Sequence, residues 1–397
     1  MSDPNNPPEE RPAERAELHA EASAVQAQPT TVSPEASLSA ISTRPSAGFW
    51  GEAWRKFRQR RLAVVALLFV LLLVVVALFS PAIAGTKPVV AYYKGGYYFP
   101  AMGYFNPRWE NPVFQKDRFR KRYSDAKFKE KDPESWAIWP LVYQDPYRRV
   151  MDDEWPGRPG NPFGAEGKPS SLNLFGTDQQ GVDVFAQMVH GSRTALVVGF
   201  VSMGIASIVG VVVGALAGYF GGWADILLSR VIELVLCIPA LVLILALLAI
   251  VDKATIWHIM AVIGLTRWTG IARLARAEFM KLKEMDFVTA ARAIGASRPR
   301  IIFRHVLRNA LAPILVPITF GIASAILLES GLSFLGFGPP PPNPSWGALL
   351  QAGRATIQQT WWLIFFPGAA IFLTVLAYNL IGEGLQESTD PRLKQSD

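Results

Sequence analysis

The sequence predicts an all-helical integral membrane protein with six transmembrane helices and a long extracytoplasmic loop between the first two. Half of the 397 residues are hydrophobic and only 18% are charged, whereas soluble proteins carry about 25% charged residues. Several uncharged runs reach the roughly 20 residues that a helix needs to cross a bilayer. The net charge of +7 is mild and dispersed, which does not indicate a nucleic-acid partner and suits a chain facing anionic lipid headgroups.

The N-terminal part predicts a tail, a surface helix and a first span. Residues 1–48 are rich in Ala, Pro, Glu and Ser without apolar periodicity, so we expect a disordered cytoplasmic tail. Residues 49–61 mix Trp and Phe with five Lys or Arg, which predicts a basic amphipathic helix at the lipid bilayer surface. Residues 62–84 form the first span, since 62–83 carry no charge. The basic flank places its start in the cytoplasm.

Residues 85–193 are therefore expected outside the cytoplasm. This segment contains many Tyr, Trp and Phe residues among its charges, and loops longer than about 60 residues escape the charge rule for topology. The aromatic side chains could build a small core of their own or form a docking surface for a binding protein. Composition alone leaves both interpretations open.

Residues 194–382 contain the other five predicted spans. They are 194–219, 226–251, 255–275, 310–337 and 361–382, with the third of these interrupted by Arg267 and Arg273. The first contains Gly199, Gly204, Gly210, Gly214 and Gly218, which permit close helix packing. Six spans place both termini, including the tail 383–397, in the cytoplasm. Segment 273–308, with nine basic and three acidic residues, falls on the same side, in agreement with the charge rule.

Segment 273–308 predicts a helix-turn-helix at the cytoplasmic face. Its apolar residues recur at helical spacing, and Gly295 lies where a left-handed C-cap would reverse the chain. Ser297 can cap the second helix, with Pro299 in its first turn. We expect one apolar side on each helix, formed by Phe279, Leu282, Phe287, Ala290 and Ala291 on the first and by Ile301, Ile302, Val306 and Leu307 on the second.

The same segment resembles the EAA loop of the permease subunits of ABC importers. The matching residues are Thr289-Ala290-Ala291, Gly295 and His305-Val306-Leu307. From Leu174 to the C-terminus the chain is similar to the C-type subunit of the dipeptide/oligopeptide/nickel branch, through Phe175-Gly176-Thr177-Asp178, Gly181, Asp183-Val184-Phe185, Gly191-Ser192-Arg193, Glu329, Leu332 to Pro339, and Ser345-Trp346-Gly347. Lys87-Pro88 and Lys94 to Pro100 resemble a sub-branch with an enlarged periplasmic loop that handles microcin C and oligopeptides.

The resemblance implies a MetI-like permease in the inner membrane that imports peptides. Its implied partners are a homologous second permease, two cytoplasmic ATPase subunits that carry the ATP and Mg, and an extracytoplasmic substrate-binding protein; no cofactor is expected on this chain. The implied ATPase-coupling residues are Asp286, Thr289, Ala290, Ala291, Arg292, Gly295, Ala296, Ile301 and His305. Gly176, Thr177, Asp178, Gly181 and Asp183 form the implied extracytoplasmic motif.

Three positions depart from the family pattern. Thr289 stands where Glu is usual, so Asp286 or Glu284 would have to supply a salt bridge to the ATPase. Arg308 replaces the usual Pro, which leaves the second helix free to continue into the next span. Val182 occupies a position where Arg is common.

Several residues admit a plainer interpretation beside the functional one. Glu233 and Glu329 are candidates for the transport pathway or a gate, because ionisable groups in spans are functional by default, although Glu233 could simply pair with Arg230. Asp178 and Asp183 could suggest a metal pair, but a turn and a helix cap are favoured. Trp346, Trp361 and Trp362 are expected to be interfacial anchors.

Two other function classes fit less well. An ion-gradient-driven secondary transporter or channel would need a buried carboxylate chain or a broken-helix ion site, and only isolated candidates occur. A membrane-anchored enzyme would need a catalytic constellation in 85–193, whose sole histidine is His190 at the span boundary. The sequence also lacks the G-x-x-x-x-G-K-[ST] phosphate loop, so we expect no ATPase activity in this chain.

Overall fold

The computed structural model describes residues 49–109, 113–114, 123, 125–150, 167–171, 173–251, 254–339 and 343–389. The chain divides between Trp50 and Gly51 into a smaller unit, Met1–Trp50, and a larger one, Gly51–Asp397. The predicted tail at 1–48 lies outside the described residues, as do residues 390–397 of the predicted C-terminal tail. The description below concerns the larger unit.

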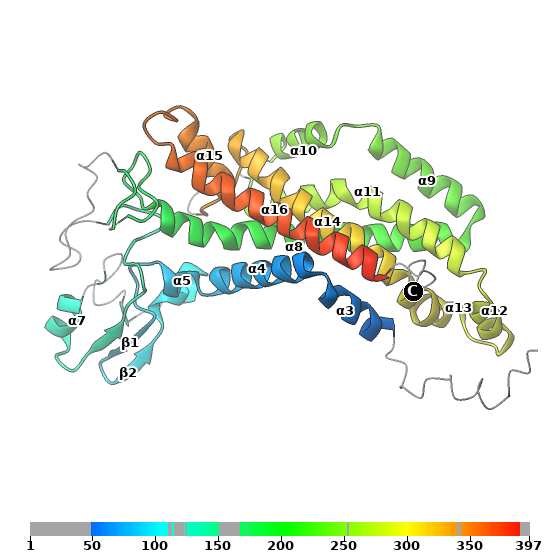
Figure 1. Cartoon of the computed structure of the whole chain (residues 1–397), viewed down its shortest axis with the longest axis horizontal. Helices are drawn as coiled ribbons and strands as arrows, with labels where there is room; N and C mark the ends of the chain where they lie inside the picture. The colour runs from blue at the N-terminus through cyan, green and yellow to red at the C-terminus, as the bar shows by residue number, and fades with distance from the viewer. Residues whose placement is uncertain are drawn as a thin grey trace, which may run out of the picture. The chain divides into compact units, whose positions relative to one another are not determined.

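Long helices dominate this unit and lie side by side (Figure 1). They are α4 (Arg61–Leu78), α8 (Val184–Phe220), α11 (Ile256–Leu282), α14 (Leu307–Phe334) and α16 (Trp362–Thr389). Four helical stretches are long and apolar enough to cross a membrane, namely α4, α8, Arg298–Phe334 and α16, and a bent pair of helices gives up to a fifth. The helix at the predicted span 255–275, α11, is not among them.

The bent pair consists of α9 (Gly222–Leu236) and α10 (Ala240–Ala249), whose axes differ by 83°. Pro239 occupies the N-cap of α10, and a proline cannot continue the hydrogen-bond ladder of the preceding helix. The predicted single span at 226–251 is therefore broken near its middle. An ion pair between Asp225 and Arg276, whose Nη2 lies 2.7 Å from the carboxylate, joins α9 to α11.

The predicted all-helical class holds for the bundle, and a small three-stranded sheet that was not predicted adds to it. β1 (Val90–Tyr93) pairs antiparallel with β2 (Gly96–Tyr98) and with β3 (Trp136–Ile138), in the order β2-β1-β3. Burial alternates along β1, so that one face of the sheet can cover a core. That core is aromatic and consists of Ala91, Tyr93, Phe114, Tyr123 and Phe128. The segment between the first two long helices therefore packs on itself.

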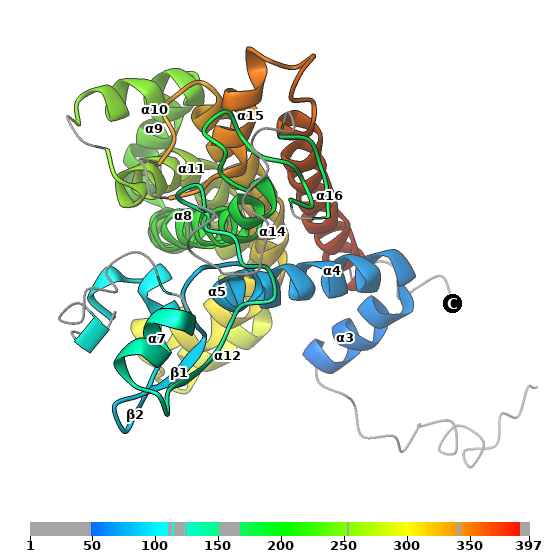
Figure 2. The same cartoon turned by 90° about the vertical axis from the view of Figure 1, so that its left-hand side faces the viewer.

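The two ends of the bundle carry different elements. At one end, the hairpin end, lie α12 (Asp286–Ala293) and α13 (Arg298–Arg300); at the other, the sheet end, lie the sheet, α5 (Ser80–Ile83) and α15 (Trp346–Arg354) (Figure 1). Figure 2 looks onto the sheet end and shows the sheet below α5 and α15 above it. The remaining described elements are α3 (Phe49–Gln59), the 3-10 helices Pro100–Tyr104 and Pro107–Trp109, and α7 (Asp125–Lys131).

Glycines set the contact between α8 and α11. A Cβ built on Gly210 would lie 2.7 Å from the carbonyl oxygen of Trp268, and one on Gly214 would lie 2.5 Å from that of Ala272. Gly218 continues this row at four-residue spacing against Arg276. Residues four apart share one face of a helix, so the row forms a smooth strip on which the α11 backbone rests. The predicted role of these glycines is confirmed here, but Gly204 has open space around it.

Element boundaries differ from the sequence prediction in three places. The helix α8 begins at Val184, ten residues before the predicted span, because Asp183 caps it by accepting from the backbone N–H of Ala186 at 2.7 Å. The segment 338–360, between the last two predicted spans, contains α15, which the Ser345 side chain caps. The last helix runs to Thr389, into the predicted tail 383–397.

Helix α3 agrees with the predicted amphipathic helix over 49–61. Its Phe57 is buried, and a Cβ on Gly384 of α16 would lie 3.1 Å from that ring. Arg60, next to the end of α3, pairs with Glu387 of α16 at 2.5 Å. These contacts tie the start of α4 to the end of α16.

Candidate functional site

The hairpin end is organised by a glycine turn after α12. Gly295 has a φ of +79°, the left-handed conformation that favours glycine. Its N–H donates to the carbonyl of Arg292 at 3.0 Å, and the N–H of Ala296 donates to that of Ala291 at 3.0 Å. This pair of bonds is a Schellman motif, which satisfies the last carbonyls of α12 while reversing the chain. The prediction of a left-handed C-cap at Gly295 is confirmed.

One face of α12 holds the hairpin together and the other is open. Val288, Ala291 and Ile301 are buried, each at most 4% exposed. The predicted apolar side is wrong for Phe287 and Ala290, which are exposed. The face of this short helix that packs against the hairpin contains Val288 and Ala291 instead. The exposed residues of the predicted coupling set are Asp286, Thr289, Ala290, Arg292 and Gly295, whereas Ala296 and His305 are half-buried. Ile294 at the tip is 85% exposed.

The second arm of the hairpin continues without a break into α14. Ser297 occupies the N-cap position of α13, but its side chain makes no capping hydrogen bond, and Pro299 lies in the first turn. A π-helical segment, Ile301–Val306, then joins α13 to α14, so that Arg308 lies inside continuous helix as its sequence allows. The hairpin and the long helix α14 are therefore joined by continuous helix.

The implied extracytoplasmic motif lies at the sheet end. Gly176 has a φ of +78°, and a Cβ there would lie 2.7 Å from Nε1 of Trp362. That nitrogen donates to the carbonyl of Thr177 at 2.9 Å, and Nε1 of Trp346 donates to the carbonyl of Met188 at 3.0 Å. Trp346 and Trp362 are thus buried, which overturns their prediction as interfacial anchors; they clamp the start of α8 to α15 and α16. Trp361 is exposed.

Asp178 and Asp183 make the turn and the helix cap that the sequence favours. The Asp178 carboxylate accepts from the N–H groups of Gln180 and Val182, both at 2.9 Å, and from Nε2 of Gln187 at 2.8 Å. Gly181 has the positive φ that this turn requires. Burial raises the pKa of Asp178. Both oxygens of the Asp178 carboxylate therefore accept hydrogen bonds from the protein itself, and neither needs a ligand as a partner.

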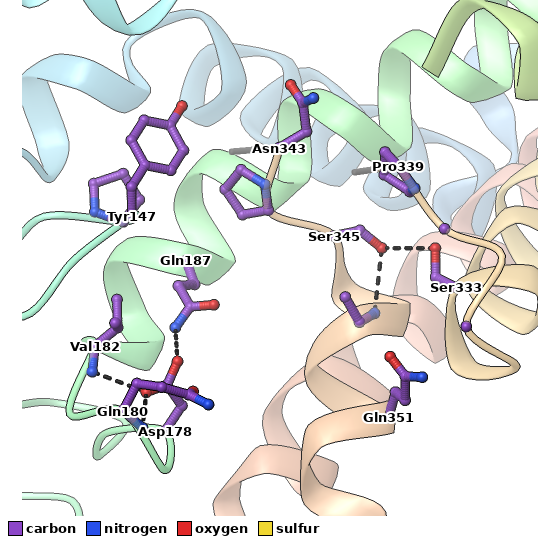
Figure 3. A pocket seen from close by; sticks show the side chains of 15 residues that line it. Tyr147, Asp178, Gln180, Val182, Gln187, Ser333, Pro339, Asn343, Ser345 and Gln351 are labelled. Carbon is purple, nitrogen blue, oxygen red and sulfur yellow. Dashed lines mark hydrogen bonds between the residues drawn. The ribbon is translucent and has the colours of Figure 1, made fainter. Parts of the chain in front are cut away.

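A pocket of about 610 Å³ opens beside this turn. Figure 3 shows Asp178 and Gln187 on one of its sides and Ser333, Ser345 and Gln351 on the other. Both serines belong to a polar cluster around Glu329. The pocket therefore lies between the start of α8 and the link from α14 to α15.

Glu329 is 1% exposed, and its side chain accepts hydrogen bonds from serine hydroxyls. Its carboxylate accepts from the hydroxyl of Ser333 at 2.6 Å, from that of Ser345 at 2.9 Å and from that of Ser330 at 3.5 Å. Glu233 lies elsewhere: it is exposed on α9 and pairs with Arg230 at 2.5 Å. The structure therefore separates the two predicted gate candidates and places only Glu329 among buried groups.

Sequence reasoning missed the serines that complete the Glu329 cluster. Ser345 follows Pro344 and precedes an apolar helical stretch, which is a signal for an N-cap. Its hydroxyl accepts from the N–H of Ala348 at 3.4 Å while donating toward Glu329. The capping role could have been predicted, but the link to Glu329 depends on how α15 folds back onto α14.

Asp183 predicts a pH dependence of stability. Burial raises the pKa of its carboxyl from 3.8 to about 7, and the nearby Asp178 acts in the same direction; Oδ2 has no hydrogen-bond partner among the described residues. The folded protein then binds the proton more tightly than the unfolded chain, so this contribution is complete below pH 3.8 and decreases as the pH rises towards 7. We expect Asp183→Asn, which keeps the acceptor for Ala186, to flatten the fall of Tm between pH 4 and 7. Equal slopes for the two proteins in thermal unfolding would contradict this assignment.

Comparisons with known proteins give a consistent result. Residues 210–395 match the family model for the binding-protein-dependent transport system inner membrane component. Residues 48–98 match that for the N-terminal TM domain of oligopeptide transport permease C. The first of these regions contains the whole hairpin.

Individual proteins are also similar to this chain. The dipeptide transport system permease protein DppC of Alkalihalophilus pseudofirmus is 40% identical over 234 residues, which cover 59% of this chain and 77% of that protein. The probable D,D-dipeptide transport system permease protein DdpC of Escherichia coli is 38% identical over 224 residues, 56% of this chain and 75% of that protein. A solved structure of the methionine ABC transporter MetNI aligns with a TM-score of 0.39 at 17% identity, covering 50% of this chain and 96% of that chain.

Proposed function

The chain belongs to the family of dipeptide and oligopeptide ABC transporter permeases, and we propose that its α12–α13 hairpin couples ATP hydrolysis by partner subunits to peptide import. As a member it is the permease subunit of an ATP-driven peptide importer. The observation that carries the coupling proposal is the exposed hairpin, which lies inside the matched region and continues into α14. The ATPase activity then resides in separate subunits.

The proposed topology has six spans with both termini in the cytoplasm. The hairpin end is cytoplasmic, since segment 273–308 is strongly basic and positive residues stay inside. The sheet end, with β1 to β3 and α15, is extracytoplasmic. In this arrangement α11 is the fourth span, and its charged residues face protein or the transport pathway rather than lipid.

The proposed assembly contains four kinds of subunit around one pathway. A homologous second permease completes the pathway, two ATPase subunits contact the hairpins, and a substrate-binding protein delivers peptide at the sheet end. ATP-driven closure of the ATPase pair would move each hairpin and tilt α14 with it. Transport follows only if ATP and the loaded binding protein favour the same outward-open state.

Reconstitution tests this function directly. The complete importer in proteoliposomes should accumulate a tripeptide such as trialanine only with ATP and binding protein present, and the isolated chain should accumulate none. Uptake by the isolated chain, or uptake driven by an ion gradient without ATP, would refute the proposal. Labelling from the cytoplasmic side of a cysteine placed at exposed Ile294, in a chain whose exposed Cys237 is replaced by serine, would support the topology.

We further propose that Glu329 transmits motion of α14 to α15. Glu329→Leu should leave the hydroxyl of Ser333 without its acceptor and the hydroxyl of Ser345 with only Ser333 at 3.1 Å. A buried unsatisfied hydroxyl costs about 1 to 3 kcal/mol. We expect a lower Tm and loss of peptide import, measured in detergent and in proteoliposomes. The matched variant Glu329→Gln keeps an acceptor oxygen and should retain most of both; a Leu variant with full import would refute the proposal.

A further inference from the structure

Arg267 lies in the middle of α11 and has no ion-pair partner among the residues that the structure describes. Its Nε atom is buried without a hydrogen-bond partner among the described residues, and none of the ion pairs within the described ranges includes this side chain. The position is eleven residues from the start of α11, which is about 16 Å along the helix. A cation near the centre of a membrane is costly unless it meets an anion or water.

The residue Arg267 lines a groove of about 380 Å³ between α10, α11 and α14. On α14 the groove runs from Ser324 to Leu335, eleven residues or about 16 Å, so it extends from mid-depth to the sheet end. Arg267 and Ser324 are its polar residues, and most of the remaining wall is aliphatic or aromatic. The groove is therefore mainly apolar, with the cationic residue Arg267 in its wall.

The nearby acidic residue does not neutralise this cation. Glu329 is on α14 between groove-lining Leu328 and Gly331, but it is absent from the groove lining. Its oxygens accept from serines of α14 and from Ser345 at the N-cap of α15. No acidic side chain among the described residues therefore neutralises Arg267.

We propose that Arg267 receives the C-terminal carboxylate of the peptide during its passage through the membrane. This inference rests on the proposed function and adds to it a residue that recognises the substrate. The planar guanidinium fork matches a carboxylate with two parallel hydrogen bonds. The apolar walls formed by Leu241, Leu327 and Phe334 suit peptide side chains, and a small peptide presents one terminal carboxylate whatever its sequence.

The test compares two probes in the reconstituted importer. Trialanine and its C-terminal amide are imported by the wild type and by Arg267→Gln, with the same saturating binding protein, and the ratio of the two initial rates is measured. Any preference of the binding protein is common to both complexes, so the change in ratio reports the permease alone. We expect the preference for the free carboxylate to fall about tenfold, the size of a lost charge-assisted hydrogen bond of about 1.4 kcal/mol.

Matched variants make the outcome specific. Arg267→Lys keeps the charge and should restore part of the preference, while Arg273→Gln, on the same helix but outside the groove, should leave the ratio unchanged. An unchanged ratio in Arg267→Gln would overturn the inference. Loss of the second permease from purified Arg267→Gln complexes would also overturn it, because the arginine would then pair with a carboxylate of that subunit. If the wild type imports neither probe with ATP, the proposed function itself fails.

Discussion

Replacing Gly295 by valine should abolish the stimulation of the partner ATPases and peptide import while leaving the chain in the membrane. The backbone at Gly295 has a φ of +79°, where an L-residue costs about 1–2 kcal/mol and a β-branched residue more. The space around its Cα is open, so the penalty comes from the backbone and cannot be relieved by repacking.

The valine variant can relieve this backbone penalty most easily by losing the turn. The two hydrogen bonds that close it, from Gly295 to Arg292 and from Ala296 to Ala291, would be lost together, and the exposed face of α12 would turn away from the ATPase subunit. Since about 1.4 kcal/mol corresponds to tenfold in an equilibrium, we expect stimulated ATPase and import to fall about tenfold or more.

Gly295→Asn is the control, because asparagine tolerates the left-handed conformation at little cost. It should keep most of the activity, and both variants should insert and copurify with the second permease. ATP hydrolysis stimulated by loaded binding protein is the measurement. A valine variant as active as the asparagine variant would remove the hairpin from the coupling mechanism.

The local features of the hairpin could be predicted from sequence because they depend on neighbours in the chain. A glycine between two apolar helical patterns fixes a left-handed cap whatever surrounds it. The same reasoning failed for Phe287 and Ala290, since the burial of so short a helix is decided by the residues that it meets. In α12 the buried residues are Val288 and Ala291, and which face of the helix they occupy follows from tertiary packing.

The sheet end could be predicted far less well. Tryptophans near the ends of spans are usually interfacial, yet Trp346 and Trp362 are buried because each indole N–H finds a backbone carbonyl more than 150 positions away. The three short strands also carry a weak signal, because their ten residues belong to aromatic-rich segments of a long polar loop. Long-range pairing of this kind leaves no periodicity in a single sequence.

The contact between α8 and α11 is where the largest loss of stability is expected. Gly214→Ala adds one Cβ at 2.5 Å from the carbonyl oxygen of Ala272 and 2.6 Å from the Cβ of Ala275. Both obstacles belong to the backbone or to its first side-chain atom, so no rotamer change can remove the clash, and the two helices must separate. Overpacking of this kind costs about 3 kcal/mol, and the separation also weakens the neighbouring contacts of Gly210 and Gly218.

Gly204→Ala on the same helix is the matched control, because a Cβ there meets nothing within 4 Å. Alanine is favoured over glycine in helices by about 1 kcal/mol, so this variant should be as stable as the wild type or slightly more stable. Thermal unfolding in detergent, together with the amount of folded protein in membranes, measures both. The opposite signs follow from packing alone, since the chemical change is identical; equal stability of the two variants would mean that α8 and α11 do not pack through the glycine strip in the membrane.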